Sequence, residues 1–271
     1  MAPKDRAIVL PKQAFKYNVK QSRFEQLHFN GSMRVLCSGK SGAGKGQLLL
    51  NAVTNFWRGC FEGGIVIVAR TANLDPTFQD IKEYAEKRYK QDNKEKQFIF
   101  TDPADPKLME LFLEHEALVR KEKIQRRTDK SKEPLTSKLY IFDDVSDSPE
   151  LKIREGLLPK LFTTGRHSSQ SVWCNVHQLT AVSPLLRKNA STLCIFKIAN
   201  AVEMQKIAEE YSWLIGKDEF MDMYDQSAGK RAPPYSFLTI MCAEQDPNRM
   251  FYSRFDQRLT VESDDEDEEE G

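Results

Sequence analysis

Residues 34–50 read R-V-L-C-S-G-K-S-G-A-G-K-G-Q-L-L-L. A short apolar run, typical of a buried strand, breaks into a glycine-rich turn and resumes as a leucine-rich helix. Residues 39–45 match the phosphate-binding pattern G-x-x-x-x-G-K. Glycines let the backbone curl so that several N–H groups and the positive end of the helix dipole face one point. The stretch predicts a strand, a phosphate loop and a helix; the alternative is a tight turn with no ligand.

The phosphate loop predicts which residues would contact ATP. Lys45 would bridge the β and γ phosphates, and the next residue is ordinarily a Ser or Thr whose hydroxyl binds Mg²⁺. Here that residue is Gly46. Water would then fill the missing position around the metal, which weakens Mg²⁺ binding but keeps the phosphate contacts. Gln47 and Ser41 are the candidates for compensation. The predicted nucleotide-binding residues are Gly39, Lys40, Ser41, Gly42, Ala43, Gly44, Lys45, Gly46 and Gln47.

A second motif, K-L-Y-I-F-D-D-V-S-D, spans residues 138–147. Its apolar run is typical of a buried parallel strand, and two carboxylates end it. It is similar to a Walker B strand. Asp143 would hold Mg²⁺ through water, and Asp144 would orient and deprotonate the attacking water. The alternative is a strand that ends in a polar turn.

Composition sets the class of protein. The 271 residues are 40% hydrophobic and 30% charged, enough for one large α/β domain, which we place at residues 31–258. We expect an irregular arm over 1–30 and a disordered acidic tail over 259–271. No signal-like or membrane-length apolar run occurs, so we expect an intracellular protein with no membrane partner. Five cysteines without metal-type spacing indicate reduced core residues.

Charge is distributed unevenly. Residues 262–270 carry eight acidic groups and no basic group, and the rest of the chain carries 40 basic and 32 acidic residues, a net charge of +8. A basic body suits a polyanion such as double-stranded DNA. Residues 120–132 contribute seven basic and two acidic residues. This segment is either a DNA-contacting loop or an exposed helix end with a linker.

Hydrophobic periodicity predicts the remaining elements. Apolar runs predict strands at 65–69, 98–100, 171–176, 193–198, 237–242 and 249–254. Apolar faces with helical spacing predict helices at 45–57, 78–89, 202–215 and 219–224, and further helices after Asp105 and after Pro149. A loop is expected around Arg187.

The spacing of the two motifs indicates the class of phosphate-loop protein. Asp143 follows Lys45 by 98 residues, with two strand–helix units between them. Many small-molecule kinases place the second motif on a nearer strand, whereas RecA-like motor ATPases insert strands between the two. Gln178 ends the strand that follows the Walker B strand, where a polar side chain can sense the γ-phosphate.

Four motifs in order carry a family resemblance: G-K-S-G-A-G-K, I-F-D-D-V, T-G-R-H followed by H-Q, and L-R-K-N-A-S-T-L-C-I-F-K, between residues 33 and 255. They resemble the FtsK–HerA superfamily, and within it the poxvirus-type genome-packaging ATPases of large eukaryotic DNA viruses, virophages and polinton-like elements. The resemblance implies a RecA-like fold with a mostly parallel sheet flanked by helices. It also implies a homo-oligomeric ring that uses ATP and Mg²⁺ to thread double-stranded DNA into a capsid.

The resemblance further implies a capsid or portal partner, a site of action in the host cytoplasm or nucleus where virions assemble, and an arginine supplied by the neighbouring subunit. Arg166 and Arg187 are both candidates for this arginine, and either could instead be a surface or DNA-facing residue. His167 and His177 have no third metal ligand at suitable spacing. Because of Gly46, a second hypothesis stays open: a nucleotide-binding subunit deficient in hydrolysis, with a structural or DNA-binding role.

Overall fold

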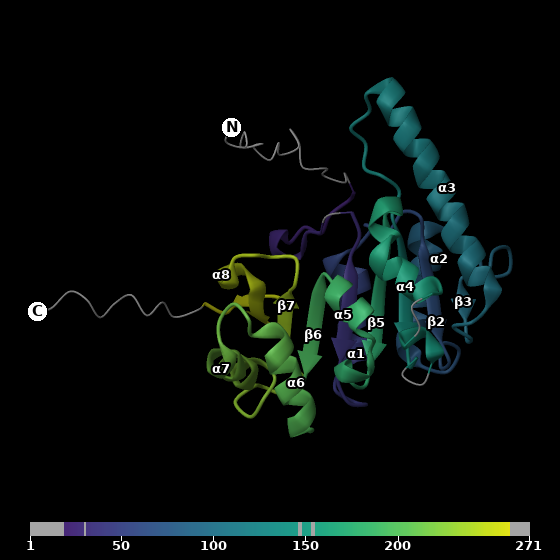
Figure 1. The fold of residues 1–271 in the computed structure, drawn as a ribbon. Helices are drawn as coiled ribbons and strands as arrows, with labels where there is room; N and C mark the ends of the chain where they lie inside the picture. Colours follow the sequence, from purple (N-terminus) through teal and green to yellow (C-terminus); the bar gives the residue numbers. More distant parts are fainter. Residues whose placement is uncertain (1–18, 30, 146–147, 153–154, 261–271) are drawn as a thin grey trace, which may run out of the picture.

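The computed structural model describes residues 19–29, 31–145, 148–152 and 155–260 (Figure 1). These residues form one nine-stranded sheet in the order β3-β2-β4-β5-β1-β6-β7-β8-β9. The strands from β3 to β6 pair in parallel and the last three pair antiparallel. The strands are β1 Arg34–Ser38, β2 Ile65–Ala69, β3 Ile99–Phe100, β4 Lys138–Asp143, β5 Gln170–Val176, β6 Thr192–Phe196, β7 Phe237–Met241, β8 Phe251–Ser253 and β9 Gln257–Arg258.

Helices cover both faces of the sheet, because consecutive parallel strands need crossover connections. α1 and α2 pack on one face, and α3 to α7 pack on the other. The mostly parallel α/β fold predicted from the sequence is confirmed. The helices are α1 Lys45–Asn51, α2 Pro76–Tyr89, α3 Pro106–Asp129, α4 Leu157–Thr163, α5 Pro184–Asn189, α6 Ala201–Tyr211, α7 Lys217–Ser227 and α8 Pro247–Met250.

Strand β5 lies between the strands that carry the two motifs. Leu36 of β1 pairs with Cys174 of β5, and Phe142 of β4 pairs with the same residue from the other side. All three strands run in the same direction, so their carboxyl ends meet at one edge. We call this the carboxyl edge, and the opposite end the amino edge.

The core consists of two layers, one on each face of the sheet. Alternate residues of each central strand contribute to each layer; Val35 and Leu36, for example, pack on opposite faces. Strands buried on both faces account for the continuous apolar runs in the sequence. The five cysteines form no disulfide, and all except the partly buried Cys242 are buried, which agrees with the predicted core positions of the other four.

Two local predictions are wrong, and one open alternative is decided. Residues 120–129 are the end of α3, which is the second of the two alternatives, since Arg, Lys, Glu and Gln are good helix formers even beyond the core. Arg187 lies in helix α5, which begins at Pro184, and not in a loop. Arg249 lies in the short helix α8, whose first turn is capped by Asp246, so the following strand begins only at Phe251.

The chain ends are described only in part. Of the predicted arm, residues 19–29 contain a 3-10 turn, Glu25–Leu27, and a bridge from Val19 to Leu135. Residues 1–18 and the acidic run after residue 260 lie outside the described residues. Within the described part of the chain, no helix is long and apolar enough to cross a membrane.

Candidate nucleotide-binding site

The glycine-rich loop leaves β1 at the carboxyl edge and enters α1. Gly42 has φ of 72° and Gly44 has φ of 106°, both in the left-handed region that favours glycine. The N–H of Gly39 donates to the carbonyl oxygen of Val176 at 3.1 Å, which ties the loop to β5. The backbone therefore has the curled form that a phosphate-binding loop requires.

Lys45 is the first residue of α1, and its ammonium lies inside the loop. Its Nζ donates to the carbonyl oxygens of Gly39 at 2.5 Å and Lys40 at 3.0 Å. Burial lowers the pKa of Lys45, while nearby acidic groups, Asp143 and Asp144 among them, raise it. A partly desolvated cation held by carbonyl oxygens is placed to exchange them for phosphate oxygens.

Asp143 is the last residue of β4 and lies at the same edge. Burial raises the pKa of its carboxyl, and the Asn175 amide and then the Lys45 ammonium oppose this rise. Trp173 Nε1 donates to Asn175 Oδ1 at 2.7 Å, which fixes the orientation of the amide. Asn175 is a site residue that sequence reasoning missed. Its signal in the sequence is a polar residue between the apolar residues Cys174 and Val176 near the end of the strand.

Asp144 has φ of 53°, a left-handed conformation that Asp adopts more readily than most residues. Its Oδ1 lies 3.6 Å from His177 Nε2, and both side chains are about half exposed. His177 and Gln178 follow β5, and Gln178 is exposed. The structure therefore brings Lys45, Asp143, Asp144 and Gln178 to one edge, on three adjacent strands.

The two candidate arginines lie elsewhere. Arg166 is exposed in the 3-10 turn Gly165–Ser168 that precedes β5, so it lies at the amino edge. There it lines a cavity of about 520 Å³ together with Arg34. Arg187 is 14% exposed and pairs with Glu210, with Nε 2.9 Å from Oε2. Neither arginine approaches the phosphate loop of its own chain.

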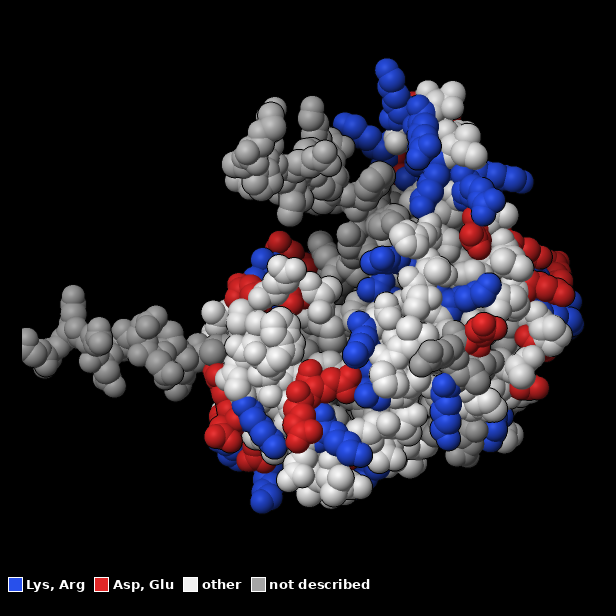
Figure 2. Space-filling view, viewed as in Figure 1, with Lys and Arg blue, Asp and Glu red and all other residues white. Residues whose placement is uncertain are grey.

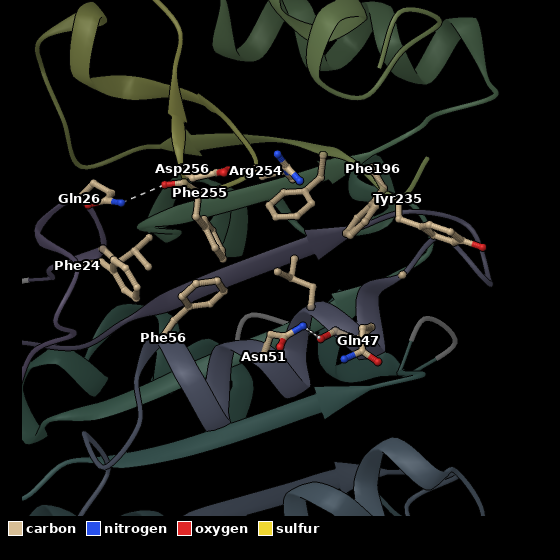
Figure 3. Close-up of a pocket in the computed structure, with 14 residues that line it drawn as sticks. Phe24, Gln26, Gln47, Asn51, Phe56, Phe196, Tyr235, Arg254, Phe255 and Asp256 are labelled. Atoms are coloured by element: carbon tan, nitrogen blue, oxygen red, sulfur yellow. Dashed lines mark hydrogen bonds and ion pairs between the residues drawn. The ribbon is translucent and has the colours of Figure 1, made fainter. Parts of the chain in front are cut away.

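A larger cavity, of about 590 Å³, opens beside the phosphate loop (Figure 3). Gln47 of α1 lines it, and Ser41 lies on the loop; both residues are exposed. Tyr235 lies at the end of the cavity nearest the loop, and the ring of Phe196 lies beside it. Its lining is mainly aromatic and apolar: Phe24, Gln26, Leu27, Gly44, Gln47, Leu48, Asn51, Phe56, Phe196, Tyr235, Phe237, Arg254, Phe255 and Asp256.

A protein-family model described as Poxvirus A32 protein matches residues 20–267, nearly the whole chain. The chain belongs to the poxvirus A32 protein family. This confirms the family that the four motifs indicated. No curated protein matches this member of the A32 family.

The fold of this A32 family member is also found in the solved structure of an NTPase. The genome packaging NTPase B204 from Sulfolobus turreted icosahedral virus 2, solved in complex with AMP, is 12% identical with a TM-score of 0.50. The match covers 80% of this chain and 96% of that one. The cytoplasmic domain of the Thermomonospora curvata Type VII secretion ATPase EccC is 13% identical with a TM-score of 0.49, over 84% of this chain and 25% of that one.

Proposed function

We propose that this protein is an ATPase that drives double-stranded DNA into a viral capsid, and that residues 31–258 form its single ATPase domain. The observation that carries the proposal is the position of β5. Because β5 lies between β1 and β4, its polar end is placed beside both the phosphate loop and the two carboxylates. Family membership and the fold shared with B204, which is named as a genome packaging NTPase, support the same function.

The residues at the carboxyl edge fit a magnesium–nucleotide complex. Mg²⁺ prefers one or two protein oxygens together with phosphate oxygens and water. The partly buried carboxylate of Asp143, close to the Lys45 ammonium, is placed to anchor such a complex. Bound Mg²⁺ would neutralise negative charge on the phosphates. Asp143 would hold it through water.

The remaining side chains divide the reaction between them. Lys45 would exchange its loop carbonyl partners for phosphate oxygens. Asp144 would orient the attacking water and accept its proton, and Gln178 at the end of β5 would respond to the γ-phosphate. His177, 3.6 Å from the Asp144 carboxylate, limits the directions in which this base can point.

The aromatic cavity is a suitable site for the base of ATP. It begins at Gly44, so a nucleotide with its phosphates in the loop would reach it directly. The ring of Tyr235 lies within 3.5 Å of the position a β-carbon on Gly44 would occupy, and Phe196 is equally near. Aromatic faces beside the loop offer stacking for adenine.

For completion of the site in a homo-oligomeric ring, we propose Arg166 as the arginine supplied to a neighbouring subunit. It is exposed, whereas Arg187 is held by Glu210 inside its own chain. A guanidinium from the next subunit would stabilise charge that develops on the γ-phosphate. A capsid or portal protein would receive the DNA at the assembly site in the host cytoplasm or nucleus.

We place DNA contacts on the exposed end of α3. After the buried Val119 this helix extends beyond the sheet (Figure 1), and Figure 2 shows Lys and Arg side chains gathered over it. A run of cations on a projecting helix suits a phosphate backbone. The basic side chains of this segment are Arg120, Lys121, Lys123, Arg126 and Arg127.

Magnesium-dependent ATP hydrolysis with and without double-stranded DNA tests the proposal. We expect DNA-stimulated turnover that is lost in Lys45→Ala and Asp144→Asn. A second function, nucleotide binding without hydrolysis, is favoured by one observation, the absence of a hydroxyl at Gly46. Binding without turnover, converted to turnover by Gly46→Thr, would establish that second function and overturn the first.

A further inference from the structure

The first turn of α2 lies next to the first turn of α1. β2 pairs with β4 so that Ala69 is opposite Asp143, and the chain leaves β2 at the carboxyl edge. It then enters α2, where the Asp75 carboxylate accepts a hydrogen bond from the N–H of Thr77 at 2.8 Å. This cap fixes the position of Thr77 on the helix.

Asp143 faces the same side of the sheet as α1 and α2. Leu139 and Ile141, which precede it on alternate positions of β4, pack in the core layer that contains these two helices. Because side chains on a strand alternate between faces, the Asp143 carboxylate continues this row. The carboxylate, Gly46 and Thr77 therefore belong to one layer of the molecule.

The Thr77 hydroxyl lies beside the position of the missing loop hydroxyl. A β-carbon added to Gly46 would be 3.4 Å from Thr77 Oγ1, and Thr77 is the nearest residue to that position outside the turn that carries Gly46. A Ser or Thr at residue 46 would carry its oxygen one bond beyond such a carbon. The Thr77 hydroxyl makes no hydrogen bond to any other described residue, so its lone pairs are available.

We propose that Thr77, from α2, supplies the hydroxyl ligand for Mg²⁺ that the phosphate loop lacks at Gly46. The inference rests on the proposed binding of magnesium–ATP. The metal requires an oxygen at the correct place, whichever helix carries it. Gly46 contributes by having no side chain, which leaves the space between α1 and α2 open to the Thr77 hydroxyl.

This assignment distinguishes Thr77 from the loop residues that could replace the hydroxyl. Gln47 lines the aromatic cavity, and Ser41 is exposed on the loop. Apart from the chain neighbours of Gly46, Thr77 lies nearest to the position of the missing side chain, and it approaches that position from another helix. A hydroxyl supplied by Thr77 also explains why the chain keeps both carboxylates after β4 although its phosphate loop lacks a Ser or Thr.

The experiment measures the affinity of a fluorescent ATP analogue with excess Mg²⁺ and, separately, with EDTA. The variants are Thr77→Val, which keeps the shape and removes the hydroxyl, Thr77→Ser, and Gly46→Ser combined with Thr77→Val. Thr71→Val, in the connection between β2 and α2, is the matched control. Mn²⁺ binding in the presence of ATP, followed by electron paramagnetic resonance, gives a second readout that does not depend on turnover.

We expect Thr77→Val to weaken nucleotide affinity with Mg²⁺, and Mn²⁺ affinity, by roughly tenfold or more, and to leave affinity in EDTA unchanged. Thr77→Ser and Thr71→Val should resemble the natural protein, and Gly46→Ser should restore metal-dependent binding to Thr77→Val. Equal metal dependence in Thr77→Val and the natural protein would overturn the inference alone. A natural protein that binds no nucleotide under either condition would overturn the proposed function as well.

Discussion

Gly39 and Phe196 approach so closely that a β-carbon on Gly39 would lie 2.7 Å from the β-carbon of Phe196. Phe196 is buried and cannot retreat. We expect Gly39→Ala to lower the free energy of unfolding by about 1–3 kcal/mol, measured by urea denaturation. Gly42→Ala is the control, since nothing lies within 4 Å of its added carbon and the cost is only its positive φ. A loss of less than about 1 kcal/mol in Gly39→Ala would contradict the close-approach argument.

Asp144→Asn should separate nucleotide binding from hydrolysis. Asn also tolerates the left-handed backbone that Asp144 adopts, so the fold should be retained. Loss of the carboxylate should slow ATP turnover by about 10²-fold or more, because no base remains at this position. Single-turnover hydrolysis and nucleotide affinity, measured on the same preparation, check this. Unchanged turnover would remove Asp144 from the reaction.

Arg166→Ala should reduce ATP turnover, whereas Arg187→Ala should reduce stability. Removal of Arg187 leaves the partly buried Glu210 without its partner, which should cost about 1–3 kcal/mol of stability. Removal of the exposed Arg166 should change stability by less than about 0.5 kcal/mol. If Arg166 acts on the neighbouring site, its loss should slow turnover of the assembled ring by about 10³-fold. Thermal melts and steady-state ATPase rates distinguish the two residues, and full activity in Arg166→Ala would exclude it.

His115 should make stability depend on pH. Burial, followed by the charge of Lys138, lowers the pKa of His115 from 6.5 to about 3. The unfolded chain therefore takes up a proton near pH 6.5 that the folded chain refuses until near pH 3, so stability falls as the pH drops through this window. Between pH 7 and pH 5 the loss from this group should be about 2 kcal/mol. Urea denaturation at both pH values should show a correspondingly smaller loss in His115→Gln.

The end of α3 should contribute to the salt dependence of DNA binding. Lys121→Gln combined with Arg127→Gln removes two exposed cations from this helix. If both side chains contact phosphates, the slope of log affinity against log salt concentration should become shallower by about 2. Lys82→Gln combined with Lys87→Gln on α2 is the matched control, because these lysines lie on the opposite face of the sheet. Equal slopes for the two double variants would place the DNA contacts elsewhere.

Local sequence patterns were sufficient for the parts of the fold that one segment determines. The run Ile65–Ala69 was predicted with its observed bounds, because five apolar residues lie between turn residues. The phosphate loop and the Walker B carboxylates likewise follow from short motifs. The loop and the carboxylates meet at one edge of the sheet because β1, β5 and β4 pair in parallel.

Relationships between distant segments were not accessible from the sequence. Thr77 and Gly46 are 31 residues apart and become neighbours only when α1 packs against α2. Asn175 acquires its place beside Asp143 from the parallel pairing of β4 and β5. The helical state of residues 120–129 was left open because that part of α3 has no core-facing pattern to reveal it.

If the protein is the proposed motor, the hydrogen bonding of β5 limits where a conformational change can begin. Ladders of five residue pairs join β5 to β1 on one side and to β4 on the other. The phosphate loop and the carboxylates therefore follow strands that are held together by β5. These strands cannot move apart unless the hydrogen bonds on one side of β5 break. A movement caused by loss of the γ-phosphate would therefore begin in the exposed side chains of His177 and Gln178, at the carboxyl end of β5. The strands of the central sheet would keep their relative positions.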